Sequence, residues 1–166
     1  YDVNLDAENF SGNLVFDELN VENFNAHFQI NGKGLYKEDI DLEINGFFSD
    51  FIMNEYRYDD VALSGYFKNK AFNGKLQLTD KFIELDFKGN IDLNVQPLEF
   101  DFSLNLKNTN LYQLGITSIY PASKIFFNSH FSGFGNDWKD FTGYVNVEDI
   151  KFLNEDNVYD LSLIHI

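Results

Sequence analysis

Apolar and polar residues alternate along most of this chain, and the longest such run lies in its middle. From Ile83 to Val95 every odd position is apolar or glycine, and every even position is polar or charged. A strand sorts such an alternation onto two opposite faces, whereas a helix would scatter it around its surface. The run therefore predicts one extended strand of thirteen residues with an apolar face.

A second alternating run follows in the opposite parity, from Leu98 to Leu106. Gln96-Pro97 lies between the two runs, and we expect the connection there because proline is expelled from the middle of a sheet. Shorter alternating runs occupy 3–7, 24–30, 40–44 and 61–67. One apolar and one polar face is typical of antiparallel strands. We therefore expect an all-β fold, a long antiparallel sheet with nearly no helix.

Turn signals complete this picture. Asn31-Gly32 follows the run at 24–30, and Asn-Gly is a strong signal for a two-residue hairpin turn. Asn110 could cap a single helical turn that includes Leu114 and ends at Gly115. Residues 137–140 could form another short turn.

A repeated template begins at Phe10, Phe72 and Phe141: phenylalanine, a small polar residue, glycine, then alternating apolar residues. In each copy the glycine takes an apolar-face position of a strand, where it marks a bend, a bulge or a close backbone approach. The copies recur about every 60 to 70 residues, which suggests stacked supersecondary units as in solenoid-like proteins.

Composition narrows the classes of function. The chain has 19 Phe and 9 Tyr against 2 Pro, a bias that favours sheets. Its 27 acidic and 12 basic residues give a formal charge of −15. Nucleic-acid binding draws on Lys and Arg that displace counterions, and Arg57 is the only arginine, so we expect no nucleic-acid partner. The absence of cysteine excludes disulfides and zinc–thiolate sites.

The acidic residues are the first candidates for chemistry. Asp39, Asp41 and Glu43 have the alternate spacing that could present three carboxylates to calcium. A solvated strand face explains this spacing better, because no calcium-loop motif accompanies it. Glu84 and Asp86, or Glu99 and Asp101, could be read as a glycosidase pair, but every predicted strand carries such residues on its polar face.

The histidines give no stronger signal. His27, His130 and His165 are far apart in the sequence, and no two have the spacing of metal ligands. The chain has no glycine-rich phosphate loop and no nucleophile elbow. We expect no enzyme, no metal and no cofactor.

The apolar face is therefore the main candidate. It could be the closed core of two packed sheets, or an apolar trough that stays partly open to acyl chains; periodicity alone leaves both interpretations open.

One resemblance favours the trough. The segment from Tyr56 to Gly115 resembles the repetitive β-region of the TamB family, within the AsmA-like group. The elements that carry this resemblance are Tyr56 and Tyr58, Gly65, Phe72 to Asp80, Ile83 to Asp92, Pro97, Phe100 to Leu106, and Asn108 to Leu114.

The resemblance implies a sheet curled lengthwise into a groove, a β-taco, in a parent protein anchored in the inner membrane and spanning the periplasm. It also implies phospholipid acyl chains as cargo, a BamA/TamA-type outer-membrane partner, and a role in phospholipid transport or outer-membrane protein assembly. The residues expected on the groove floor are Leu76, Leu78, Ile83, Leu85, Phe87, Ile91, Leu93, Phe100, Phe102, Leu104 and Leu106.

Two alternatives stay open: a fragment of an outer-membrane β-barrel, and a closed β-sandwich interaction module. We expect residues 1–160 to be a fragment of a larger repetitive protein, since the chain starts at Tyr1. Residues 161–166 resemble the translation of a sequencing adapter, and we expect them to be a non-native tail.

Overall fold

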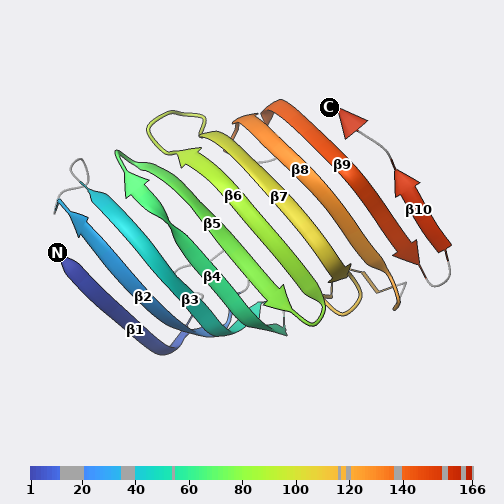
Figure 1. Ribbon diagram of the computed structural model, residues 1–166, viewed down its shortest axis with the longest axis horizontal. Helices are drawn as coiled ribbons and strands as arrows, with labels where there is room; N and C mark the ends of the chain where they lie inside the picture. The colour runs from blue at the N-terminus through green and yellow to red at the C-terminus, as the bar shows by residue number, and fades with distance from the viewer. Residues whose placement is uncertain are drawn as a thin grey trace.

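The computed structural model describes residues 1–11, 21–34, 40–53, 55–115, 117–118, 121–136, 140–154, 157–161 and 164–165. These residues contain no helix and form one antiparallel sheet (Figure 1), which confirms the all-β prediction. The strands are β1 (Asp2–Ser11), β2 (Asn23–Lys33), β3 (Asp41–Met53), β4 (Tyr56–Lys68), β5 (Ala71–Asp80), β6 (Ile83–Asp92), β7 (Glu99–Asn110), β8 (Lys124–Phe134), β9 (Thr142–Asn154), β10 (Asn157–Leu161) and β11 (Ile164–His165).

The strands follow one another through the sheet in chain order, from β1 to β10. The short β11 pairs with β9, through Ile164 opposite Val147. Within the described part of the chain β1 pairs only with β2, so the sheet does not close on itself. No second sheet packs on it among these residues, and this differs from the two layers of a β-sandwich.

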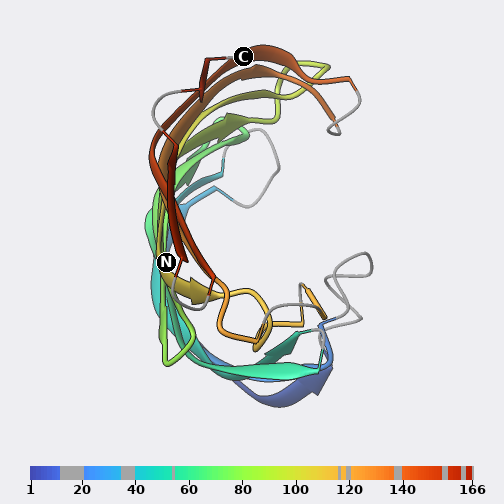
Figure 2. The same ribbon diagram turned by 90° about the vertical axis from the view of Figure 1, so that its right-hand side faces the viewer.

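The sheet is strongly bent along its strands, and seen from the side it has the outline of an open arc (Figure 2). Its strand ends form two rims. We call the edge where β7 ends and β8 begins the Asn110 rim, and the opposite edge, where β6 ends and β7 begins, the Asp92 rim.

Residues with a left-handed backbone conformation contribute to the bending of the strands near the Asn110 rim. Asn9, Asp50, Asn108 and Asp149 have φ of 49°, 52°, 46° and 53°, and they lie in β1, β3, β7 and β9. Asn and Asp tolerate this conformation better than other residues with a Cβ. The ladders of β1, β7 and β9 shift register close to these residues. Such bulges bend a strand and increase its twist.

The predicted hairpin turn at Asn31-Gly32 is wrong. Both residues lie within β2, opposite Glu43 and Leu42, and the ladder continues to Lys33. Pairing with β3 continues past the local turn signal, and a Cβ on Gly32 would stand 2.4 Å from the Asp41 carbonyl oxygen and 2.6 Å from Leu42 Cδ2. The chain leaves the strand later, at Gly34, whose φ is +88°.

The predicted thirteen-residue strand is also too long, because β6 ends at Asp92. The backbone N–H of Asn94 donates to Asp92 Oδ1 at 2.7 Å, an Asx turn that competes with further strand pairing. Leu93 and Val95 continue the alternation in sequence, yet they are 45% and 39% exposed.

The turn predicted at Asn110 is confirmed. The Gln113 N–H donates to Asn110 Oδ1 at 3.0 Å, and the Leu114 N–H donates to the Asn110 carbonyl at 3.2 Å. Gly115 then reverses the chain with φ of +71°. We call residues Asn110–Gly115 the rim turn. The other predicted turn falls mainly on residues 137–139, and the first repeat copy on residues 12–17, all outside the described residues.

Candidate functional site

Strand register gathers the apolar residues of successive strands into rows that cross the sheet. Each residue of a row lies directly opposite the next one on the neighbouring strand, so all of them share one face. Three such rows are Leu78–Leu85–Leu106–Phe127, Leu76–Phe87–Leu104, and Phe67–Phe72–Ile91–Phe100. We call the side of the sheet that carries these rows the apolar face, and the other side the polar face.

Ten of the eleven residues expected on the groove floor lie on this face. Leu76 and Leu78 come from β5, and the others come from β6 and β7: Ile83, Leu85, Phe87, Ile91, Phe100, Phe102, Leu104 and Leu106. The eleventh, Leu93, lies beyond the end of β6 because of the Asx turn.

The apolar face is covered at the Asn110 rim. Leu78, Ile83 and Leu106 are buried there in one cluster with Leu114, which is 4% exposed. Because Leu114 belongs to the rim turn, that turn packs onto β5, β6 and β7 at this end of the face. The resemblance implied a groove floor for these three residues, and in the structure they are buried in this cluster at the Asn110 rim.

The middle of the apolar face carries three glycines in adjacent strands. Gly65, Gly74 and Gly89 lie opposite one another across β4, β5 and β6. The Phe72 ring lies against the first two, because a Cβ on Gly74 would stand 2.4 Å from Phe72 Cζ. At Gly89 the close neighbour is not a ring but the Phe102 Cβ, which would stand 2.3 Å from an added Cβ. Gly65 and Gly74 thus make room for the Phe72 ring, and Gly89 allows the close approach of β7.

An open hollow of about 410 Å³ lies on the apolar face toward the Asp92 rim. Its walls are aromatic, with Phe102 and Phe131 stacked at 4.9 Å between ring centroids and Phe100 and Phe141 at 5.7 Å. We call this the Phe pocket; its lining residues are Phe100, Phe102, Phe131, Gly135, Asn136, Phe141 and Val145. All four phenylalanines are half-buried.

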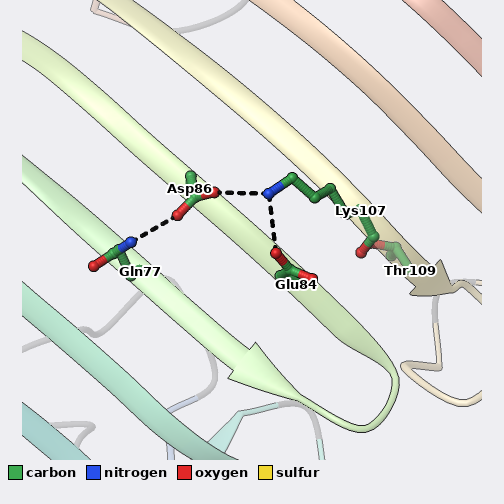
Figure 3. A network of polar contacts seen from close by, with 5 residues as sticks. All are labelled: Gln77, Glu84, Asp86, Lys107 and Thr109. Atoms are coloured by element: carbon green, nitrogen blue, oxygen red, sulfur yellow. Dashed lines mark hydrogen bonds and ion pairs between the residues drawn. The ribbon is translucent and has the colours of Figure 1, made fainter.

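The polar face holds a network of charged side chains. Lys107 Nζ lies 2.9 Å from Glu84 Oε1 and 3.3 Å from Asp86 Oδ2, and Gln77 donates to the other oxygen of Asp86 at 2.9 Å (Figure 3). The hydrogen bonds from Gln77 and Lys107 lower the pKa of Asp86, and those to Glu84 and Asp86 raise the pKa of Lys107. All three charged side chains are 38% to 45% exposed, and their ion pairs link β6 to β7 across the polar face.

Register also creates a trio that the sequence alone did not reveal. Ser103 Oγ lies 3.2 Å from His130 Nδ1, and His130 Nε2 lies 3.6 Å from Asp101 Oδ2. These are the residue types of a hydrolase triad, but β7 and β8 are paired on both sides, so their backbone N–H groups serve the ladders and not an oxyanion. His130 and Asp101 are 40% and 55% exposed. We assign this trio no catalytic role.

Two further candidates, Asp41 and His27, lie in surface ion pairs. Asp41 lies 2.7 Å from Lys68 and 3.8 Å from Lys33, and the hydrogen bond from Lys68 lowers its pKa. Asp39 lies outside the described residues. His27 pairs with Asp6 on the neighbouring strand. Over the part of the chain that the structure describes, no three His, Asp or Glu side chains gather as metal ligands would.

The fold thus defines a class, an open, single-sheet, antiparallel β-meander with one apolar face. No protein-family model, curated protein or solved structure matches this chain. A search of the described residues for membrane-spanning helices found none of sufficient length and apolar character.

Proposed function

We propose that this chain is a segment of a lipid-conducting β-groove, in which the apolar face binds the acyl chains of phospholipids. One observation carries the proposal: apolar rows continue without interruption across β4, β5, β6 and β7. An acyl chain lying across the strands would meet apolar side chains at each step. Burial of each methylene contributes about 0.8 kcal/mol, so a continuous apolar path keeps a lipid tail out of water throughout its passage.

The curvature of the sheet supports the same proposal. The open arc seen in Figure 2 gives the face an inner side on which a groove could run from β1 toward β10. Several apolar-face residues are only half-buried, among them Leu76, Phe87 and Phe102. A lipid tail could therefore remove further apolar surface from water, which a fully packed core could not offer.

The wider setting of the proposal comes from the resemblance to the TamB family. In that setting the parent protein is anchored in the inner membrane and crosses the periplasm to a BamA/TamA-type partner in the outer membrane. The proposed activity is passive phospholipid transport, with a contribution to outer-membrane assembly. It requires no catalytic residue.

Site-specific photo-crosslinking tests the lipid part of this proposal. A photoreactive amino acid is placed at Leu76 or Phe102 on the apolar face, and at Lys75 or Ser103, their sequence neighbours on the polar face. Each protein is illuminated with phosphatidylcholine vesicles, and the covalent lipid adduct is measured by intact-protein mass spectrometry. We expect adducts at Leu76 and Phe102 in several-fold excess over those at Lys75 and Ser103. Equal yields at both sets of positions would contradict the proposal.

A further inference from the structure

We infer that a hollow on the polar face binds a sugar acid, a pyranose ring that carries one carboxylate. The hollow has a volume of about 280 Å³ and lies over the neighbouring strands β3, β4, β5 and β6 (Figure 1). Small-molecule sites span about 300–1,000 Å³, so this volume suits a single ring rather than a long chain. We call it the lysine hollow. Acyl-chain binding is a separate property, because it uses the opposite face of the sheet.

Strand register brings the lining of the lysine hollow together from residues far apart in the sequence. Cross-strand partners form two neighbouring rows on the polar face, two residues apart along each strand. One row is Asn45–Ser64–Lys75–Lys88, and the other is Glu43–Tyr66–Asn73. All of these residues line the hollow, together with Gly65 and Gly74 between the rows.

Two lysines stand directly opposite each other in this hollow. Lys75 and Lys88 are cross-strand partners, and both are exposed. Like charges in this arrangement repel each other and destabilise the pairing of the strands. Lys68, by contrast, lies opposite an acid and pairs with Asp41 at 2.7 Å. Within the described residues neither Lys75 nor Lys88 has an ion-pair partner, so a carboxylate bound between the two amines would offset their repulsion.

The second row supplies a hydrogen-bond acceptor and an aromatic surface. Tyr66 Oη and Asn45 Nδ2 each donate to Glu43 Oε1 at 3.4 Å, which leaves Glu43 Oε2 available to a ligand hydroxyl in the described structure. Tyr66 is 57% exposed, and its ring offers apolar surface to the C–H groups of a pyranose. Ser64 and Asn73 can each donate or accept.

These groups ask for two properties in one ligand. A lysine amine only donates hydrogen bonds, and an ionised carboxylate such as Glu43 only accepts them. The ligand must therefore bring an anionic acceptor to the lysines and a hydroxyl donor to Glu43. Acetate has no hydroxyl, and a neutral sugar has no anion. A sugar acid has both.

The charge of the whole chain limits the number of negative groups on the ligand. With a formal charge of −15, the molecule sets up a negative potential that acts on every charge of an approaching ligand. The ion pairs with the two lysines form only at contact distance. A sugar with one carboxylate is therefore favoured over a polyanionic glycan.

The test compares glucuronic acid with glucose, in which a hydroxymethyl group replaces the carboxylate. Each sugar is titrated into the isotope-labelled full chain, and two-dimensional amide NMR spectra report both the affinity and the position of binding. At low salt we expect glucuronic acid to bind about fivefold more tightly, because one exposed ion pair contributes roughly two- to fivefold in affinity. The ratio should fall toward one in about 1 M salt, where the Debye length is about 3 Å.

Matched variants locate the site. Lys75→Gln and Lys88→Gln should each weaken glucuronic acid binding about two- to fivefold and leave glucose binding unchanged. Lys151→Gln on β9 removes the same charge outside the hollow and should change neither. Tyr66→Val removes the ring, keeps a residue that favours strands, and should weaken both sugars. All four positions are exposed, and circular dichroism checks that the sheet is retained.

The outcomes distinguish the parts of the inference. Equal affinity for the two sugars at low salt would overturn the role of the lysine pair. Acetate that binds as tightly as glucuronic acid would identify a simple anion site and overturn the assignment of a sugar. Amide shifts centred away from Ser64, Tyr66 and Lys75 would overturn the location. If neither sugar moves any signal, the whole inference fails, while the proposed function on the apolar face is unaffected.

Discussion

Gly89 on β6 lies directly opposite Phe102 on β7, so closely that a Cβ on Gly89 would stand 2.3 Å from the Phe102 Cβ and 2.4 Å from the Asp101 carbonyl oxygen. Backbone and Cβ atoms cannot move aside as the end of a flexible side chain can. The lack of space for a Cβ on the apolar face therefore explains why position 89 is glycine. Its backbone does not adopt a left-handed conformation.

Replacing Gly89 with alanine should lower the free energy of unfolding by about 1–3 kcal/mol, because the added methyl overpacks the β6–β7 ladder. Urea denaturation followed by circular dichroism measures the change. Gly115→Ala is the matched control: it meets open space but must hold φ at +71°, which should cost about 1 kcal/mol. An unchanged denaturation midpoint for Gly89→Ala would contradict the close approach described above.

Leu114→Ala should detach the rim turn from the strands beneath it. Leu114 is 4% exposed and packs with Leu78, Ile83 and Leu106, so its truncation leaves a cavity. We expect a loss of about 2–4 kcal/mol in the free energy of unfolding, measured by thermal or urea denaturation. Tyr112→Ala in the same turn removes a ring that is 39% exposed and should change stability by less than about 0.5 kcal/mol. Equal effects of the two substitutions would show that the turn does not cover the face.

The Lys107 network should make stability depend on pH in a defined direction. The pKa of Asp86 is lower in the folded protein than its ordinary 3.8, so its contribution is present above that value and is lost as the pH falls through the folded pKa. The pKa of Lys107 is raised above 10.5, so its contribution is lost only as the pH rises beyond that value.

Lys107→Met should therefore be less stable than the unaltered chain at pH 7, and this difference should shrink as the pH falls below about 3.8. Urea denaturation of both proteins between pH 2 and pH 7 measures it. Lys75→Met is the control, since this lysine lies opposite Lys88 on the polar face and its removal breaks no acidic pair in the described structure. A stability difference that stays constant over this pH range would contradict the assigned role of the network.

The alternation of apolar and polar residues predicted the strands well, because successive side chains of a strand point to opposite faces of the sheet. It could not predict where pairing stops. Leu93 continues the pattern from Ile83, but the Asx turn between Asp92 and Asn94 ends the strand first. At Asn31-Gly32 the opposite happened, and pairing with β3 carried the strand past a strong local turn signal.

The candidate site was only partly predictable for the same reason. Parity assigned Gly74 and Gly89 to the apolar face, but their position opposite each other depends on the register of β5 against β6. The trio of Ser103, His130 and Asp101 likewise arises from the register of β7 against β8. Sequence spacing within one strand carries no information about which residues stand opposite on the next.

The strict chain order of the strands from β1 to β10 has a consequence for how such a protein can change in evolution. Each strand relies on its immediate neighbours, so a hairpin can be duplicated or lost without disturbing distant parts of the sheet. Every added pair of strands would lengthen the molecule by about 10 Å across the strands and leave its two sides chemically unchanged. The length of the sheet across its strands can therefore change one hairpin at a time, while the types of residue on its two faces stay the same.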